Sequence, residues 1–294
     1  MSHESLPHLI GVDGGGSSCR AALRLGPDGP RHEVTLGAAN VSTNFDEAVA
    51  TIREALGQLC EKAGLPQAEL VRARAHLGLA GVMNEEIAGR VAAALPIGRA
   101  QVTDDRPTTL AGAFGDGNGA VAAIGTGSFL GRQQGGQQKL AGGWGFVIGD
   151  QASGAWIGRR LLEEVVLCVD GFSAETELVR DVLAAHGRDP SLIVAFSLSA
   201  RPKDFADFAR HVEAAAVLGD PLAKALMEEG AGYIVRGLAS LGWRKGEPLC
   251  LMGGLGPAYA PFLPQVMQRS LVPPKGSALD GALALAARIP EGVT

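Results

Sequence analysis

Residues 8–36 read HLIGVDGGGSSCRAALRLGPDGPRHEVTL, and this stretch decides the fold of the first part of the chain. Apolar runs at 9–12, 19–25 and 32–36 alternate with turn sequences, first GGGSS and then GPDGP at 26–30. Clusters of Gly, Pro, Asp and Ser between such runs are typical of hairpin turns. The stretch therefore predicts three strands joined as a meander of two hairpins.

Helices and strands alternate after this meander. The sequence NVSTNFDEAV opens a helix that Ser42, Thr43 or Asn44 can cap, because such side chains accept the first backbone N–H groups of a helix. The elements expected next are a strand at 73–81, a helix at 85–95, a strand at 99–105 and a short helix around 107–114. The order βββαβαβα indicates an α/β layer with a mixed sheet.

From Gly119 this pattern starts again. Residues 119–143 give a strand, a Gly/Thr/Ser loop, a second strand, a Gly-Gly turn and a third strand, which indicates an internal duplication. The later elements expected are helices at 155–169, 202–217 and 277–288, helices opened by Asp189-Pro190 and Asp220-Pro221, and a buried strand within 248–256.

The predicted fold class is α/β with two domains. A chain of 294 residues is near the practical limit of a single core, which favours two. We expect the domains to span residues 1–115 and 116–294.

Composition excludes several classes of protein. The net charge is −5 and no cluster of five basic residues occurs, which argues against binding to nucleic acid or to a membrane surface. Neither a signal peptide nor an apolar run of membrane-spanning length is evident, and the four cysteines are scattered without a CxxC motif. These features favour a cytoplasmic protein with reduced thiols.

Two glycine loops are candidates for phosphate binding. The sequence DGGGSS at 13–18 runs into a strand and no lysine follows it, which excludes the Walker and dinucleotide loops. A hairpin lined by N–H groups can still bind an anion, with a hydroxyl from Ser17 or Ser18 and with Mg²⁺ held at Asp13. The alternative is a plain glycine turn. A matching loop at Gly125–Ser128 favours phosphate binding, since two facing hairpins would hold a polyphosphate from two sides.

Further polar residues are candidates for substrate chemistry. Asp104 and Asp105 end the strand VTDD, so one of them could act as a general base, whereas the alternative is that one caps the next helix. Trp144 lies between glycines and offers a flat apolar face for a sugar ring, and Asp150 could bind ring hydroxyls. The alternative for both Trp144 and Trp156 is packing, which we favour for Trp156.

These motifs together resemble a known family. DGGGSS, GLAG, VTDD, IGTGS, GGWGFVIGDQASGAWIG and LMGGLG occur in the order and spacing of the BadF/BadG/BcrA/BcrD ATPase-like family, and nearly the whole chain is similar to its N-acetylglucosamine and glucosamine kinases. The resemblance implies two ribonuclease-H-like (actin-like) domains around an ATP cleft, with the helix at 277–290 packing back on the first domain. It also implies ATP and Mg²⁺ as cofactors, an amino sugar phosphorylated on its 6-OH, and a homodimer, whose interface nothing in the sequence marks.

The resemblance assigns roles position by position. It implies Asp13 for Mg²⁺, Gly14, Gly15, Gly16 and Ser17 for the first phosphate loop, Gly125, Thr126 and Gly127 for the second, Gly253 and Gly254 for the adenosine, Asp105 as the catalytic aspartate, and Asn40, Asp105, Ser128, Trp144, Gly145 and Asp150 for the sugar. The chain departs from the family at Ser17, where Thr is usual, and at Asp104, where Asn is frequent. Gln151 replaces a frequent Glu, which leaves the preference for a free amine or an acyl group open.

Two other functions fit the same family or fold. An ATPase activator with a shared [4Fe–4S] cluster needs cysteine thiolates in exposed loops. Cys60 and Cys168 lie instead on expected helices, and Cys19 and Cys250 lie in strands, so no adequate ligand set is visible. A sugar sensor without catalysis would lack Asp105 or the phosphate loops, and both are present.

Overall fold

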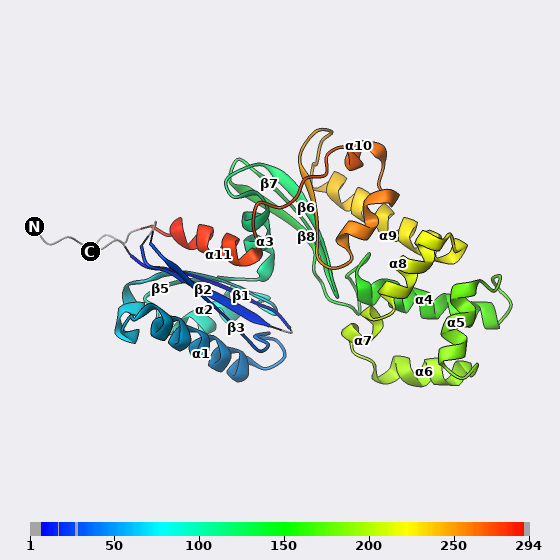
Figure 1. Cartoon of the computed structure of the whole chain (residues 1–294), viewed down its shortest axis with the longest axis horizontal. Coiled ribbons are helices and arrows are strands. Elements are labelled where there is room, and N and C mark those ends of the chain that lie inside the picture. The colour runs from blue at the N-terminus through cyan, green and yellow to red at the C-terminus, as the bar shows by residue number, and fades with distance from the viewer. Residues whose placement is uncertain (1–6, 17, 27–28, 291–294) are drawn as a thin grey trace, which may run out of the picture. The chain divides into compact units, whose positions relative to one another are not determined.

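The computed structural model describes residues 7–16, 18–26 and 29–290. The chain divides into two compact units. Unit 1 contains the described residues up to Gly117 together with those from Pro274 onward, and unit 2 runs from Asn118 to Pro273. The predicted α/β fold class is confirmed, since each unit contains its own sheet and helices (Figure 1).

Unit 1 is built on a five-stranded sheet. Its elements are β1 (Leu9–Gly14), β2 (Cys19–Arg24), β3 (Arg31–Leu36), α1 (Phe45–Ala63), the 3₁₀ helix η1 (Gln67–Arg72), β4 (Arg74–Leu79), α2 (Glu85–Ala93), β5 (Arg99–Thr103), α3 (Asp105–Phe114) and α11 (Ala278–Ala287). The order in the sheet is β3-β2-β1-β4-β5, antiparallel in the meander and parallel from β1 to β5. The predicted element order is therefore confirmed; the turn predicted at 26–30 includes residues 27–28, which lie outside the described residues.

The register of the parallel strands brings polar residues to one edge of this sheet. Asp13 of β1 pairs with Gly78 of β4, and Gly78 pairs with Thr103 of β5. Asp104 and Asp105 follow directly after Thr103. Because parallel strands end at the same edge, the acidic residues after β5 and the glycine loop after Asp13 lie at the same end of unit 1.

Helices cover both faces of this sheet, and Figure 1 shows α1 and α11 on opposite sides of it. Asn44 caps α1, since its side chain accepts the Glu47 N–H at 3.2 Å. On the other face, Leu279 and Leu283 of α11 pack against strand residues such as Leu9. The C-terminal helix thus belongs to the core of unit 1.

Unit 2 combines a smaller sheet with a larger set of helices. Its elements are β6 (Gly119–Ile124), β7 (Ser128–Gln134), β8 (Gln137–Gly142), α4 (Gly154–Val169), α5 (Glu177–Ala185), α6 (Pro190–Ser199), α7 (Pro202–Ala206), α8 (Ala209–Leu218), α9 (Pro221–Ser240), β9 (Leu249–Met252), the 3₁₀ helix η2 (Gly256–Phe262) and α10 (Gln265–Gln268). The sheet order is β8-β7-β6-β9, with β6 antiparallel to β7 and parallel to β9. Within the described residues, no helix is long and apolar enough to span a bilayer.

One predicted helix of unit 2 is wrong. The helical spacing of 202–217 indicated a single helix, but the chain breaks it into α7 and α8. The backbone of α7 lies directly on α4, where a Cβ at Gly158 would come within 1.9 Å of the Phe205 carbonyl oxygen. The bend after α7 lets Phe205 and Val212 both lie in the core of unit 2, which local spacing could not indicate.

Candidate functional site

The first glycine loop follows β1 at the polar edge of unit 1. The Ala80 N–H donates to the Gly14 carbonyl at 2.7 Å, and the Ala39 N–H donates to the Gly15 carbonyl at 3.0 Å. Gly16 is exposed, and among the described residues a Cβ there would approach only the Asn40 side chain, at 4.0 Å. The loop is therefore anchored through its carbonyl groups and bare at its outer face, where an anion could approach the backbone. Ser17 lies outside the described residues.

Asn40 lies beside this loop. Its Oδ1 accepts hydrogen bonds from the Ser42 N–H at 3.0 Å and from the Ser42 hydroxyl at 2.8 Å. Its Nδ2 would be 4.0 Å from a Cβ placed on Gly16. The amide is thus held with its donor side toward the loop, which suits an acceptor on a ligand.

Asp13 carries the carboxylate at the head of the loop. It forms an ion pair with Arg20, its partner in the register of β1 and β2. The described residues contain no group of three or more His, Cys, Asp or Glu side chains that could hold a metal ion alone. Magnesium in nucleotide sites is bound by one or two carboxylates with phosphates and water, so Asp13 fits such an ion.

The two aspartates after β5 have different environments. Asp104 is the N-cap of α3: its Oδ1 accepts the Arg106 N–H at 2.9 Å, and its two oxygens accept the Arg106 guanidinium at 2.8 and 2.9 Å. Although burial acts to raise the pKa of Asp104, these bonds lower it. Asp105 is the first residue of α3, and burial followed by the charge of Asp104 raises its pKa. The structure therefore gives the capping role to Asp104 and leaves Asp105 as the more basic carboxylate.

His76 of β4 lies next to Thr103, the last residue of β5. Its Nε2 is 3.1 Å from the Thr103 hydroxyl, which donates to the Asp104 carbonyl at 2.7 Å. Burial lowers the pKa of His76 to about 4, although a contact with Gln101 acts in the opposite direction. The imidazole is therefore neutral at physiological pH and supports the strand that ends in the two aspartates.

The second glycine loop joins β6 to β7 in unit 2. The Gly125 N–H donates to the Gly127 carbonyl at 2.9 Å, which closes a tight turn. The carbonyl groups of Gly125 and Thr126 accept the N–H groups of Gly154 and Ala155 at 2.8 and 3.2 Å. The first N–H groups of α4 are therefore already bonded, and the loop itself supplies any surface for an anion.

Gly253 and Gly254 adjoin this second loop. Gly253 has a φ of +80°, and a Cβ there would be 2.3 Å from the Ile124 carbonyl oxygen. No side chain can be placed at this contact, so glycine lets the end of β9 pack on the backbone that leads into the loop. Gly254 faces open space. The structure thus brings together the two glycine segments predicted for the nucleotide in unit 2.

Asp150 brings the predicted sugar residues of unit 2 together. Burial raises its pKa, while the backbone N–H groups of Ser128 and Gly145, which donate to its carboxylate, lower it. A Cβ on Gly127 would be 2.8 Å from its Oδ2, so the carboxylate lies directly against the second loop. The Ser128 hydroxyl donates to the Gln151 carbonyl at 2.6 Å. The sequence-predicted residues Gly127, Ser128, Gly145 and Asp150 therefore form one cluster.

The backbone around Asp150 adopts an uncommon conformation. Asp150 and Ala152 have φ values of +57° and +68°, in the left-handed region that non-glycine residues rarely occupy. The buried hydroxyl of Tyr259 donates to the Ala152 carbonyl at 2.8 Å and holds this turn. Strained backbone of this kind persists where the surrounding structure supports it, and it gathers at functional sites.

Sequence reasoning missed Tyr233 and Tyr259. Burial and then the charge of Asp150 raise the pKa of Tyr233, which comes from α9, and a Cβ on Gly142 would be 2.8 Å from its hydroxyl. Both tyrosines are far from Asp150 along the chain and no local motif surrounds them. Only the packing of α9 and η2 could reveal their positions.

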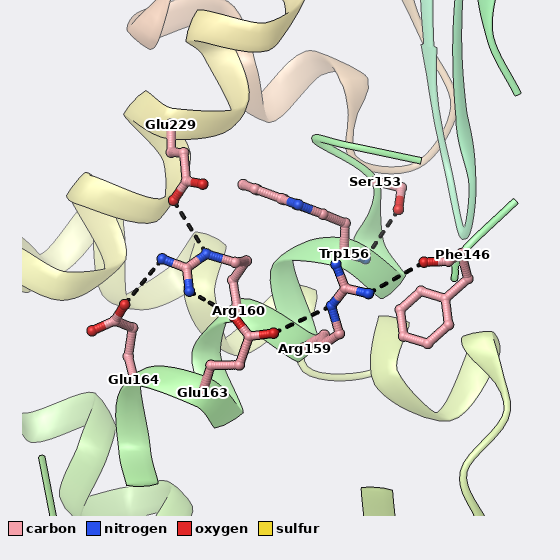
Figure 2. Close-up of polar contacts among 8 residues, drawn as sticks. All are labelled: Phe146, Ser153, Trp156, Arg159, Arg160, Glu163, Glu164 and Glu229. Atoms are coloured by element: carbon pink, nitrogen blue, oxygen red, sulfur yellow. Dashed lines mark hydrogen bonds and ion pairs between the residues drawn. The ribbon is translucent and has the colours of Figure 1, made fainter. Parts of the chain in front are cut away.

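The loop before α4 contains the exposed Trp144, and the first turn of α4 contains the buried Trp156. Figure 2 shows Trp156 at the start of this helix. Trp144 is 73% exposed, so its ring is accessible to a ligand. Trp156 is 6% exposed and packs in the core of unit 2. Its backbone N–H donates to the Ser153 hydroxyl at 3.0 Å. Phe146 contacts Arg159 of α4, whose Nη1 donates to the Phe146 carbonyl at 3.3 Å.

A groove of about 670 Å³ lies elsewhere in unit 2, between α5, α8 and the start of α9. Leu178, Phe208 and Leu218 supply part of its apolar lining. None of the residues predicted for phosphate or sugar binding lines it. In this chain the candidate site is therefore indicated by the polar loops and carboxylates, and not by the volume of a cavity.

Known or candidate sugar kinases are similar to this chain over most of its length. The glucosamine kinase GspK of Vibrio cholerae is 33% identical over 282 residues, which is 96% of each chain. An N-acetylmuramic acid/N-acetylglucosamine kinase of Clostridium acetobutylicum is 27% identical over 239 residues, 77% of this chain and 76% of that one. The crystal structure of a candidate N-acetylglucosamine kinase from Chromobacterium violaceum is 35% identical with a TM-score of 0.85, covering 96% of this chain and 99% of that chain.

The family resemblance predicted from the motifs is confirmed by a direct match. Residues 10–272 match the BadF/BadG/BcrA/BcrD ATPase family. This range contains the first glycine loop, the aspartates after β5, the second glycine loop and the segment around Asp150. The chain therefore belongs to the BadF/BadG/BcrA/BcrD ATPase family.

Proposed function

We propose that the protein is an ATP-dependent amino-sugar kinase that transfers the γ-phosphoryl group of ATP to the 6-OH of D-glucosamine or N-acetyl-D-glucosamine. The observation that carries this proposal is the end-to-end similarity to a glucosamine kinase. The arrangement of the glycine loops and carboxylates supports it, because these groups are the ones that phosphoryl transfer to a hydroxyl requires.

Asp105 is the proposed catalytic residue. Phosphoryl transfer has a loose transition state, so the enzyme mainly orients the acceptor hydroxyl and removes its proton late. The raised pKa of Asp105 makes it a better base than an ordinary aspartate. Asp104 would keep α3 in place through its cap and its pair with Arg106.

The glycine loops are the proposed phosphate-binding groups. The N–H groups of Gly16, Thr126 and Gly127 would donate to phosphate oxygens, with Gly253 and Gly254 on the adenosine side. The N–H groups of Gly15 and Gly125 instead close the two turns by donating to the carbonyl groups of Ser18 and Gly127. When bound at Asp13, Mg²⁺ would neutralise part of the phosphate charge. The ion pair with Arg20 must loosen, or a water molecule must intervene, for Asp13 to take this role.

The cluster around Asp150 is the proposed sugar-binding group of unit 2. A carboxylate held by two backbone N–H groups keeps a fixed orientation and can accept hydrogen bonds from ring hydroxyls. Trp144 would supply an apolar face for the ring, and Asn40 would donate from unit 1. Gln151 supplies its carbonyl to Ser128 and carries no charge that would attract an amine.

The cysteines do not favour an electron-transferring activator. Burial raises the pKa of Cys19 to about 12 and that of Cys250 to about 11. Cys60 is buried, and Cys168 is partly buried against the core of unit 2. Cluster ligation needs accessible thiolates, whereas three of these thiols are buried hydrophobic groups. Four free cysteines fit a reducing compartment, so we propose the cytoplasm.

A coupled ADP-release assay over a panel of hexoses, amino sugars and N-acyl amino sugars tests the function. We expect glucosamine or N-acetylglucosamine to stimulate turnover most, and the 6-deoxy analogue of the preferred sugar to give none. If no sugar stimulates ATP turnover, the kinase proposal is wrong. The proposed homodimer is tested separately by light scattering, where the mass of a single chain would contradict it.

A further inference from the structure

We infer that Arg159 is a positioning residue that holds the loop at 143–149 in the shape that the Asp150 cluster needs. Its role in sugar binding rests on the proposed function, whereas its role in holding the loop rests on contacts alone. The residue lies in the second turn of α4, outside every motif assigned above to phosphate or sugar.

Arg159 contacts the loop through one residue in two ways. Its Nη1 donates to the Phe146 carbonyl at 3.3 Å, and its guanidinium lies 5.2 Å from the centroid of the Phe146 ring (Figure 2). Its Nε faces Glu163 at 3.4 Å, one turn further along the helix. A planar guanidinium can bond a carbonyl and lie over an aromatic face at once, which a lysine cannot reproduce.

The loop has few other large anchors. Val147 and Ile148 are 83% and 81% exposed, and Trp144 is also exposed. Phe146 instead packs inward, with its ring centroid 4.9 Å from that of Phe205 in α7. Glycines at 143, 145 and 149 make the loop costly to order. The contacts of Phe146 are therefore the main side-chain attachment of the loop, and Arg159 makes the polar part of them.

The loop is linked directly to Asp150. The Gly145 N–H donates to the Asp150 carboxylate, and the Gly149 N–H donates to the Gly145 carbonyl at 2.8 Å. Because Phe146 follows Gly145 in the chain, a shift at Phe146 moves the N–H that orients Asp150. The strained φ of Asp150 makes this orientation dependent on such support.

Arg160 is a matched control in the same helix turn. It pairs with Glu163 at 2.7 Å, Glu164 at 3.0 Å and Glu229 at 3.3 Å, and Figure 2 shows its guanidinium directed at these carboxylates and not at Phe146. Removing it takes away the same charge from the same helix and disturbs the shared partner Glu163. An effect that both substitutions cause therefore reflects a general disturbance of the helix. An effect that only the Arg159 substitution causes reflects its contact with the loop.

The test compares Arg159→Gln, Arg159→Lys and Arg160→Gln in the full chain. Hydrogen exchange of the peptide that covers 143–149 is measured without ligand, and KM values for the sugar and for ATP are measured with wild type alongside. For Arg159→Gln we expect exchange and the sugar KM each to rise about tenfold, with the ATP KM unchanged. Arg159→Lys should recover part of both effects, and Arg160→Gln should match wild type.

The two proposals can fail separately. If Arg159→Gln exchanges like wild type in the loop, or if Arg160→Gln speeds exchange equally, the inference about Arg159 is wrong whatever the enzyme phosphorylates. If exchange rises for Arg159→Gln alone but wild type phosphorylates no sugar, the positioning role stands and the proposed function is overturned. Faster exchange with an unchanged sugar KM in an active kinase would contradict the link to Asp150.

Discussion

Burial raises the pKa of Asp105, and the negative charge of its neighbour Asp104 raises it further. Asp104 keeps that charge because Arg106 holds it as the cap of α3. The two adjacent carboxyl groups thus differ in their surroundings: Asp104 is bonded to Arg106, whereas Asp105 has a raised pKa. This division makes the roles of the two residues separable by substitution.

Asp105→Asn should lower kcat about 100- to 10,000-fold while binding of sugar and nucleotide stays close to wild type, because only proton removal is lost. Asp104→Asn should keep kcat near wild type, since Asn caps a helix about as well as Asp. The coupled assay and calorimetric titration measure both. A larger loss of kcat for Asp104→Asn than for Asp105→Asn would reverse the assignment.

The same pair predicts a shift in pH dependence. The base must be ionised, so kcat/KM for the sugar should fall at acidic pH with an apparent pKa above the ordinary aspartate value of about 3.9. Asp104→Asn removes a negative charge beside Asp105, which lowers the pKa of Asp105 and moves this fall to lower pH. A pH profile of Asp104→Asn that coincides with wild type would show that the fall reports another group.

Gly127→Ala tests the contact between the second loop and Asp150. The new Cβ would lie 2.8 Å from the Asp150 Oδ2, so the carboxylate must move, and the sugar KM should rise about tenfold or more. Gly125→Ala is the control, because a Cβ there would have the Gly127 carbonyl oxygen, at 4.0 Å, as its nearest neighbour. Equal KM values for the two variants would mean that the position of Asp150 does not matter to the sugar.

Asp13→Asn tests the magnesium proposal. The neutral side chain should raise the Mg²⁺ concentration for half-maximal activity at least about tenfold, with the sugar KM unchanged. Arg20→Gln should lower that concentration, because Arg20 pairs with the same carboxylate. Titration of the activity with Mg²⁺ at a fixed ATP concentration measures both changes. An unchanged Mg²⁺ requirement in Asp13→Asn would remove this residue from the metal site.

Local chemistry explains why much of the fold is predictable from the sequence. The strands β1 to β3 follow the turn signals of residues 8–36, and the caps at Asn44, Asp189 and Asp220 lie where the sequence places them. Such features depend on neighbours within a few residues. The glycine loops belong to the same class, because a hairpin turn and its bare backbone are local properties.

Features that depend on tertiary packing escape this reasoning. The break between α7 and α8 accompanies a close backbone contact of α7 with Gly158, far away in the sequence. Tyr233 reaches the neighbourhood of Asp150 only because α9 packs on β7, and the choice between Asp104 and Asp105 depends on where Arg106 reaches. Residues that support a site from another element carry no local signal of their own.

His76 should make the protein sensitive to mild acid. Its pKa is about 4 in the folded chain against about 6.5 unfolded, so the unfolded state binds the extra proton and stability falls as pH drops from 6.5 toward 4. The free energy of unfolding from urea titrations should therefore fall by about 2 kcal/mol between pH 7 and pH 5. His76→Gln should lose most of this slope, since the glutamine amide can reach the position of Nε2 and bond the Thr103 hydroxyl without titrating. An equal slope in wild type and His76→Gln would show that other groups set the acid sensitivity.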